Sequence, residues 1–220
     1  ENKIAALIGD DLGRPVSYVW FPQVVGFARN TLLSRQCDLV MGTVSGDGAM
    51  DTTTPYYHSG YMIVTRDDSP IHATSLGDPA LADARIGLIA RTPPTDLVLR
   101  HGLMAHVKPY ALATDTRAGS PPHDMAEDIV NGAIDAGILW GPLVGYYIKG
   151  EHMPLRAAFI EPEPDAPRLD WRIAMGVRGG EPDWRRRINL AIAHKRADID
   201  RVLAEYGVPL LDEQNRPVSP

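Results

Sequence analysis

The loop of residues 43–54, TVSGDGAMDTTT, has the residue types best suited to chemistry in this 220-residue chain. Its two carboxylates, Asp47 and Asp51, are four residues apart and lie among serine and threonine hydroxyls. A pair of carboxylates can act as general acid and general base, so an enzyme using Asp47 and Asp51 is one hypothesis. The loop contains neither arginine nor lysine, so it offers no cation to pair with an anionic ligand.

Other motifs for chemistry are not found in the sequence. There is no glycine-rich dinucleotide fingerprint, Walker loop or G-x-S-x-G elbow, and no H-E-x-x-H. His101 and His106 are five residues apart across an expected helix end, which is poor geometry for a shared metal ion. The other histidines fall in different expected elements, without carboxylates clustered around them. We therefore predict no metal site and no cofactor.

Composition narrows the class of protein. The formal net charge of −6 argues against a general nucleic-acid binder, which needs a basic face. No apolar run approaches the roughly 18 residues that span a bilayer, so we expect no membrane span. Cys37 is the only cysteine, which excludes a disulfide within the chain. The sequence does not supply the basic neighbour that would activate the Cys37 thiol. The simplest interpretation is that Cys37 is a small buried apolar side chain.

Helical and strand patterns alternate along the chain, which predicts an α/β fold. We expect helices over residues 1–13, 24–36, 92–102, 124–132, 142–150 and 182–206, the last broken near residue 197. We expect strands over residues 15–21, 37–42, 60–66, 85–89, 107–112, 133–141, 155–160 and 171–178. Since the order begins with a helix, we also expect a first strand before Glu1.

This order predicts two lobes. Residues 1–59 and 173–220 are expected to form lobe one, and residues 60–172 lobe two. The chain would then cross between the lobes twice, and two crossings make a hinge beside a cleft. The expected hinge residues are Tyr57, His58, Gly60, Asp170 and Trp171.

Three motifs resemble those of type II periplasmic solute-binding proteins of the amino-acid-receptor kind. They are CDLVMG, PYYHSG and NGAIDAGILWGPLVGYY, in the order and at the spacings typical of that class. The resemblance covers essentially the whole chain and implies the two-lobed type II fold. In such receptors an arginine of the loop after the first motif grips the ligand's carboxylate, and an aspartate after the later strand binds its amino group.

Neither ionic anchor is present in this chain. The loop has no arginine, and Trp140 and Gly141 stand where the aspartate would be. A free amino acid would therefore lose its hydration without matching charges, at a cost of several kcal/mol. The sequence argues against an amino-acid receptor.

A narrower resemblance is to the MxaJ and XoxJ type of binding-protein-like proteins, associated with quinoprotein methanol dehydrogenases. Residues 1–32, 37–66 and 140–147 carry it, although the subgroup's loop usually reads M-G-V-P-A-G-x-D and His58 replaces an arginine. The resemblance implies a periplasmic, non-enzymatic accessory protein that binds a PQQ-dependent methanol dehydrogenase and assists its maturation or activation. The dehydrogenase's cytochrome c is an alternative partner. A cysteine upstream of Glu1, common in the subgroup, would be a partner for Cys37.

The candidate residues for contacting a ligand or partner come from both expected lobes. Lobe one offers Trp20, Phe21, Thr43, Ser45, Asp47, Asp51 and Tyr56. Lobe two offers Arg91, Thr92, Thr95, Trp140 and Tyr146. Thr92 and Thr95 begin an expected helix, whose N-terminus favours an anionic group, but Thr92 as a plain helix cap is the alternative. For Trp20, Phe21 and Tyr57 the alternative is core or hinge packing.

Three functions stay open from the sequence. The first is the dehydrogenase accessory protein that the resemblance implies. The second is a receptor of an ABC transporter for a small ligand other than an amino acid. The third is an enzyme on the same fold, similar to cyclodehydratase-like binding proteins, with Asp47 and Asp51 as its acid and base.

Overall fold

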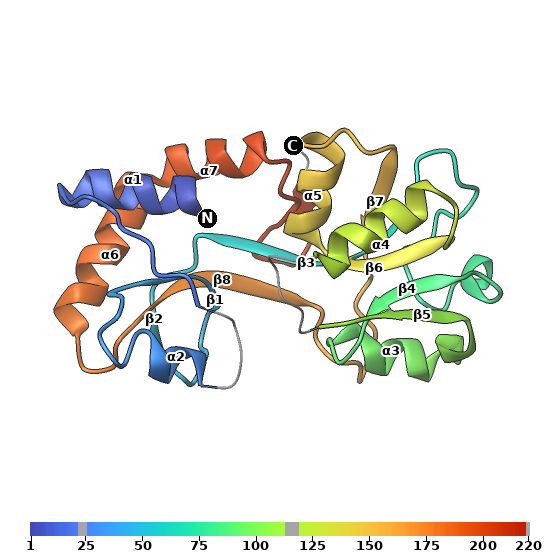
Figure 1. Ribbon diagram of the computed structural model, residues 1–220, viewed down its shortest axis with the longest axis horizontal. Helices are drawn as coiled ribbons and strands as arrows, with labels where there is room; N and C mark the ends of the chain where they lie inside the picture. The colour runs from blue at the N-terminus through green and yellow to red at the C-terminus, as the bar shows by residue number, and fades with distance from the viewer. Residues whose placement is uncertain (22–25, 113–118, 219–220) are drawn as a thin grey trace. The chain divides into compact units, whose positions relative to one another are not determined.

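The computed structural model describes residues 1–21, 26–112 and 119–218 and divides into two compact units (Figure 1). Unit 1 comprises Glu1–His58 and Trp171–Glu205, and unit 2 comprises Ser59–Asp170 and Tyr206–Pro220. The chain therefore passes between the units three times, once more than the two crossings expected from the sequence. No helix among the described residues is both long and apolar enough to cross a membrane.

Unit 1 combines a small antiparallel sheet with helices, three of which pack on one another. Its helices are α1 (Asn2–Leu12), α2 (Phe27–Asn30), α6 (Pro182–His194) and α7 (Arg196–Glu205). Its strands are β1 (Val40–Val44), β2 (Asp51–Thr52) and the part of β8 (Asp170–Val177) that follows Asp170. Strand β8 pairs antiparallel with both β1 and β2, and α1 packs on α6 and α7.

The first helix follows directly from its sequence. Ile4 and Ile8, one turn apart, are both 2% exposed because they form the apolar face that packs on the C-terminal helices. Gly13 ends the helix with φ of 63°, a left-handed conformation that glycine adopts without steric cost. The helix predicted over residues 1–13 is confirmed.

Arg178, just after β8, ties the segment before β1 to unit 1. Its guanidinium donates hydrogen bonds to the carbonyls of Leu32 (3.2 Å) and Cys37 (2.6 Å). It also bonds the carboxylates of Asp38 (2.7 Å) and Glu181 (2.8 Å). Arg178 is only 9% exposed, so this network satisfies a charge that is nearly buried.

Unit 2 is a mixed sheet covered on both faces. Its strands are β3 (Tyr57–Arg66), most of which lies in this unit, β4 (Ile86–Ile89), β5 (Val107–Tyr110), β6 (Ala136–Trp140) and β7 (Leu155–Phe159). Strands β4, β5 and β6 pair parallel, with β4 in the middle, while β3 pairs antiparallel with β6 and β7. A short hairpin, β9 (Leu210–Leu211) and β10 (Pro217–Val218), follows in the tail.

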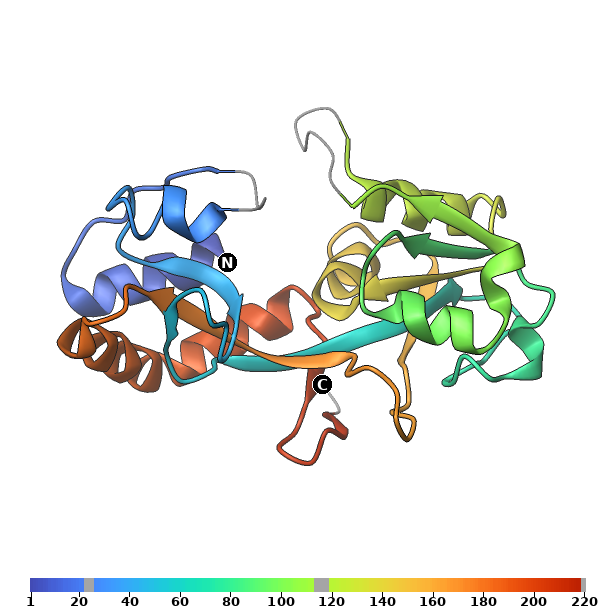
Figure 2. The same ribbon diagram turned by 90° about the horizontal axis from the view of Figure 1, so that it is seen from below.

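Successive residues of β3 point to opposite faces and build two cores. Ile63 belongs to the core under α3 (Pro94–Arg100), and Met62 and Val64 belong to the core under α4 (Pro121–Val130) and α5 (Gly141–Lys149). Figure 2 shows the green α3 and the yellow α5 on these two faces. Two short 3-10 turns, η1 (Pro79–Leu81) and η2 (Leu103–His106), complete the unit.

Two predicted elements are wrong. Residues 15–21 form no strand: their alternating side chains are exposed, and no strand among the described residues pairs with them. The helix predicted over residues 24–36 is reduced to α2, because Gly26 has φ of 87° and the Thr31 hydroxyl bonds back to the Phe27 carbonyl at 2.8 Å. Residues 24 and 25 lie outside the described part of the chain. The other predicted helices and strands are found, with ends shifted by a few residues.

The tail differs from its predicted grouping, which placed residues 173–220 in lobe one. After α7, residues from Tyr206 onward pack on α5 of unit 2. This packing needs two glycines, because a Cβ on Gly145 would lie 2.1 Å from the carbonyl oxygen of Gly207. The Ser59 hydroxyl also donates to the Pro209 carbonyl at 2.7 Å. The helical period of residues 182–206 does not indicate where the chain turns away.

Candidate functional site

The predicted contact residues fall into two sets, one in each unit. Unit 1 contains Trp20, Phe21, Thr43, Ser45, Asp47, Asp51 and Tyr56, and unit 2 contains Arg91, Thr92, Thr95, Trp140 and Tyr146. Each set is described within its own unit. A single cleft that brings both sets together stays a prediction.

The loop after β1 uses its polar groups to stabilise itself. Asp47 accepts hydrogen bonds from the Thr43 hydroxyl at 3.3 Å and from the Ala49 backbone N–H at 2.9 Å. The Gly46 N–H donates to the Thr52 hydroxyl at 3.0 Å, and the Ser45 N–H to the Arg172 carbonyl at 2.9 Å. Such side-chain-to-backbone bonds fix a loop in the way that a turn motif does. The loop is therefore a self-contained structure with its carboxylate already engaged.

The second carboxylate of the loop faces a cation from another element. Asp51 lies 3.5 Å from the guanidinium of Arg185 on α6, with both side chains partly exposed. Asp47 holds its own loop together, and Asp51 forms an ion pair. The geometry favours structural roles for both carboxylates over a general acid–base pair.

Tyr56 connects three segments of unit 1 from its interior. The ring is 0% exposed, and its hydroxyl donates to the Glu1 carboxylate at 2.6 Å and accepts from the Gly42 N–H at 3.0 Å. Tyr57 also bonds Glu1, at 3.5 Å. Burial and the negative charge of Glu1 raise the pKa of Tyr56 and of Tyr57. With no exposed surface, Tyr56 offers no face to a ligand. No local pattern in the sequence predicts its contact with Glu1.

An aromatic segment, Tyr18–Phe21, lies on the surface of unit 1. Trp20 is 77% exposed and stacks on Tyr18, with ring centroids 5.9 Å apart. The Tyr18 hydroxyl donates to the Asn2 carbonyl at 3.1 Å, which fixes the segment to the start of α1. Phe21, also exposed, meets Phe27 edge-on at 6.3 Å. Core packing, the alternative for Trp20, is therefore wrong.

In unit 2, Tyr61, Thr92 and Trp140 form a cluster, called the Trp140 cluster, at the carboxyl ends of β4 and β6. Tyr61 lies opposite Trp140 in the β3–β6 register, and their rings meet edge-on at 5.6 Å. A hydrogen bond joins the side chains of Tyr61 and Thr92, and burial raises the pKa of Tyr61. Ligands of open α/β sheets bind beyond the carboxyl ends of the strands, so the Trp140 cluster is the candidate ligand site of this unit.

The neighbours of this cluster differ from the predicted helix-terminus site. Thr92 is not a helix cap: its hydroxyl donates to the Ile89 carbonyl at 2.6 Å, and α3 starts after Pro93 without a side-chain cap. The Thr95 hydroxyl oxygen is buried and has no partner within the described ranges. Arg91 is exposed, with a left-handed φ of 62°. On α5, Tyr146 is half-exposed and stacks on Tyr206 at 6.1 Å.

The predicted hinge residues lie where the chain passes between the units. Two of the three passages follow His58 and Asp170, next to Tyr57, Gly60 and Trp171, and the third follows Glu205. His58 is 6% exposed, and the Asp170 carboxylate accepts from Arg168 at 2.8 Å. Their action as a hinge stays a prediction.

A histidine–carboxylate group that the sequence analysis missed lies on α4. Ligand atoms of His123, Asp124 and Glu127 are within 4.8 Å of one another, and His123 also contacts Glu151 at 3.1 Å. The H-D-x-x-E spacing on one helix is the signal that could have found it. Asp124 and Glu127 are exposed, so the group alone does not indicate a bound metal ion.

Comparison with known proteins identifies close relatives of the whole chain. The crystal structure of the periplasmic binding protein XoxJ from Methylobacterium extorquens AM1 matches with a TM-score of 0.80 and 37% identity, over 96% of this chain and 90% of that chain. MxaJ from Methlophaga aminisulfidivorans matches with a TM-score of 0.80 and 24% identity, over 96% and 91%. Protein MoxJ from Methylorubrum extorquens is 27% identical over 98% of this chain and 76% of MoxJ.

No protein-family model matches. The mixed α/β fold is thus that of type II periplasmic binding proteins.

Proposed function

Because the chain belongs to the family of XoxJ, MxaJ and MoxJ, we propose that it is a periplasmic accessory protein of a PQQ-dependent methanol dehydrogenase. It assists the maturation or activation of the dehydrogenase by binding it directly and performs no reaction of its own. The observation that carries the proposal is the likeness to XoxJ, which extends over nearly the whole of both chains.

The two charged residues that bind the amino acid in receptors of this fold have no counterpart in this chain, which supports a partner other than a free amino acid. The loop after β1 contains no arginine, and its Asp47 carboxylate is engaged within the loop. The corresponding position in unit 2 is occupied by the indole of Trp140 instead of a carboxylate. A zwitterion would lose several kcal/mol of hydration at such groups without an ionic contact in return.

The aromatic segment Tyr18–Phe21 supports a macromolecular partner. Tryptophan and tyrosine dominate the binding energy of protein interfaces, and Trp20 presents most of its ring to solvent. The stack on Tyr18 and the bond from Tyr18 to Asn2 hold the segment in place before binding, which lowers the entropy cost of association.

The test is binding between this protein and its purified cognate PQQ-dependent methanol dehydrogenase, measured by cross-linking and by biolayer interferometry. We expect specific association, and we expect Trp20→Ala to weaken it by about tenfold or more, because aromatic anchors contribute about 2 kcal/mol each. Leu99→Ala is the matched control, since Leu99 is an exposed apolar side chain (64%) of unit 2.

Two results would contradict the proposal: no association with the dehydrogenase, together with unchanged dehydrogenase activity in cells that lack this protein. A parallel binding experiment with the dehydrogenase's cytochrome c distinguishes the two candidate partners. If only the cytochrome binds, the accessory role is retained with a different partner.

The Trp140 cluster favours a second candidate, a receptor of an ABC transporter for a small ligand that is not an amino acid. Its aromatic rings and the Thr92 hydroxyl lie at the strand ends where α/β folds bind ligands. A ligand at 100 times its Kd would stabilise the protein by about 2.7 kcal/mol. A metabolite panel that shifts the melting temperature of the wild type but not of Trp140→Ala would support this candidate.

A further inference from the structure

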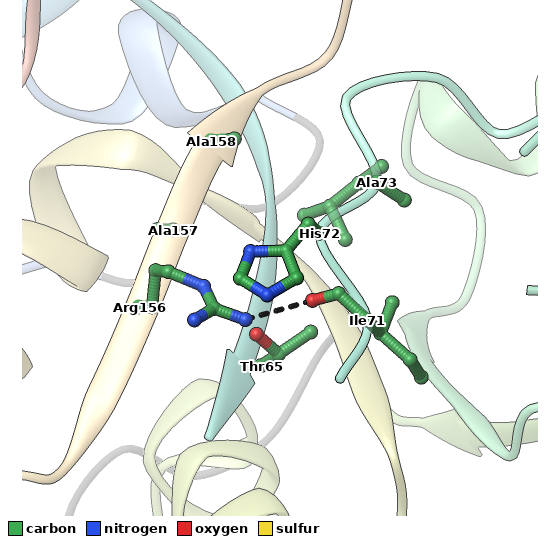
Figure 3. A pocket seen from close by; sticks show the side chains of 8 residues that line it. Thr65, Ile71, His72, Ala73, Arg156, Ala157 and Ala158 are labelled. Atoms are coloured by element: carbon green, nitrogen blue, oxygen red, sulfur yellow. Dashed lines mark hydrogen bonds between the residues drawn. The ribbon is translucent and has the colours of Figure 1, made fainter. Parts of the chain in front are cut away.

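A small pocket of unit 2 is lined by none of the residues assigned to the candidate sites above. It has a volume of about 120 Å³, and its lining comes from β3, β7 and residues 71–73 (Figure 3). Thr65 lies four residues beyond Tyr61 on β3, roughly 13 Å along the strand, so the pocket is separate from the Trp140 cluster. A cavity needs only about 10–15 Å³ to hold one water molecule, so this one has room for a small organic molecule.

The register of the sheet explains why polar and apolar groups meet here. Thr65 pairs with Arg156 and Ile63 pairs with Ala158 across β3 and β7. Directly paired residues of neighbouring strands point to the same face, and so do residues two apart. The pocket therefore has a threonine and an arginine at one end and an isoleucine and an alanine next to them.

The Thr65 hydroxyl lines the pocket without a partner. Thr65 is 4% exposed, and its side chain forms no hydrogen bond with any other described residue. Because Thr65 lines the pocket, its hydroxyl oxygen is not sealed from solvent in the way that the buried Thr95 hydroxyl oxygen is, and a molecule in the pocket can reach it. It is the kind of group that a bound molecule with a hydrogen-bond acceptor would satisfy.

Arg156 gives the pocket a positive charge, and no carboxylate within the described ranges pairs with it. Its guanidinium donates to three backbone carbonyls, those of Asp67 (3.0 Å), Ser69 (2.9 Å) and Ile71 (2.9 Å). These bonds hold residues 67–71 against β7 and use three of the five N–H groups. Among the described residues Arg156 has no ion-pair partner, so the pocket favours an anion.

The other residues that line the pocket indicate which class of anion it would bind. The His72 imidazole lines the pocket next to Arg156 and forms no bond within the described residues, so a ring N–H is available to a ligand. Ile63, Ala73 and Ala158 supply an apolar surface, whereas the side chain of Ala157, which pairs with Val64, points to the other face of the sheet. A carboxylate with a short alkyl group would bond Thr65 and His72, lie near Arg156 and place its carbons against the alanines.

We infer that this pocket is a binding site for a short-chain monocarboxylate of about two to four carbons. The site does not depend on the proposed accessory function, because it uses none of the residues of the aromatic segment or the Trp140 cluster. It does not require ordering of a loop, since Arg156 already holds residues 67–71 in place.

Isothermal titration calorimetry of the full chain with sodium propionate tests this site, with sodium acetate and butyrate as size variants and sodium chloride and phosphate as anion controls. We expect propionate to bind at about millimolar Kd or tighter, as small ligands that meet well-placed polar groups do. Thr65→Val has almost the same shape and should weaken propionate binding by about tenfold, the loss of one hydrogen bond to a charged group. Thr65→Ser should retain binding.

His72→Ala is the second variant, because His72 is exposed and its removal leaves the fold intact. It should weaken binding several-fold, whereas His106→Ala, an exposed histidine outside the pocket, should not. The inference is overturned if propionate shows no binding at about 100 times the expected Kd. It is also overturned if chloride or phosphate binds equally well, or if Thr65→Val binds propionate as the wild type does.

Discussion

The loop of residues 43–54 in unit 1 and the pocket at Thr65 in unit 2 use their polar groups in opposite ways. The loop has the composition of a ligand loop, yet Asp47 bonds Thr43 and the local backbone, and the Thr52 hydroxyl accepts from the Gly46 N–H. The pocket is lined mostly by alanine and isoleucine, yet the Thr65 hydroxyl has no partner within the described residues. A polar composition therefore indicates a binding site only where the groups are left unsatisfied after folding.

If the polar groups of unit 1 serve to stabilise it, removing a buried one should lower the free energy of unfolding more than any other change considered below. Arg178→Met should lower the free energy of unfolding by about 3 kcal/mol, because it leaves two carbonyls and the Glu181 carboxylate without their donor. Urea unfolding monitored by circular dichroism measures the change. Arg186→Met is the control, since Arg186 is 70% exposed in its pair with Asp183, and it should change stability by less than about 0.5 kcal/mol. Equal effects of the two variants would show that the Arg178 network does not hold unit 1.

A smaller loss is expected from the loop itself. Asp47→Ala removes the acceptor of two hydrogen bonds and should cost about 1–2 kcal/mol, measured by the same urea unfolding. Asp47→Asn retains one acceptor oxygen and should cost less. If Asp47→Ala is as stable as the wild type but no longer binds the dehydrogenase, the loop is a recognition element and the comparison is wrong.

The smallest of these effects is a pH dependence located in unit 2. Bonds from Arg85 lower the pKa of Asp135, and bonds from Lys108 and Tyr110 lower that of Asp128. A lowered carboxyl pKa in the folded state stabilises the protein above the unfolded pKa of about 4, and this contribution is lost as the pH falls through the folded value. Both side chains are partly exposed, so the loss should be about 1 kcal/mol in all.

Urea unfolding between pH 7 and about pH 3 measures this loss. Asp135→Asn should reduce the acid-dependent part, since the amide cannot titrate. An unchanged acid profile in Asp135→Asn would show that the Arg85–Asp135 pair does not contribute.

Local signals in the sequence predicted most elements of the fold. Gly13 and Gly102 end their helices with left-handed φ values of 63° and 71°, as their positions in the pattern indicated. The strand predicted over residues 15–21 is wrong. Alternation of apolar and polar residues indicates only which side chains would share a face, and both faces of this segment are exposed. An alternating segment forms a strand only if another strand pairs with it.

The candidate sites were less predictable because their contacts are long-range. Tyr56 reaches Glu1, 55 positions earlier in the chain, and becomes interior, although its sequence neighbourhood resembles a ligand segment. Thr65 and Arg156 become neighbours only through the pairing of β3 with β7, 91 positions apart. The resemblance indicated the family and the missing ionic anchors, but it could not indicate a pocket that depends on strand register.

The close approach of Gly145 and Gly207 has a consequence for dissecting this protein. Residues 59–170 contain the whole sheet of unit 2 but not the tail residues that cover α5. A fragment cut at these boundaries would expose the face of α5 around Gly145 and leave the Ser59 hydroxyl without Pro209. Fragment complementation is therefore the suitable approach: a synthetic peptide of residues 206–218 should rescue the isolated sheet, and a peptide with alanine at position 207 should fail.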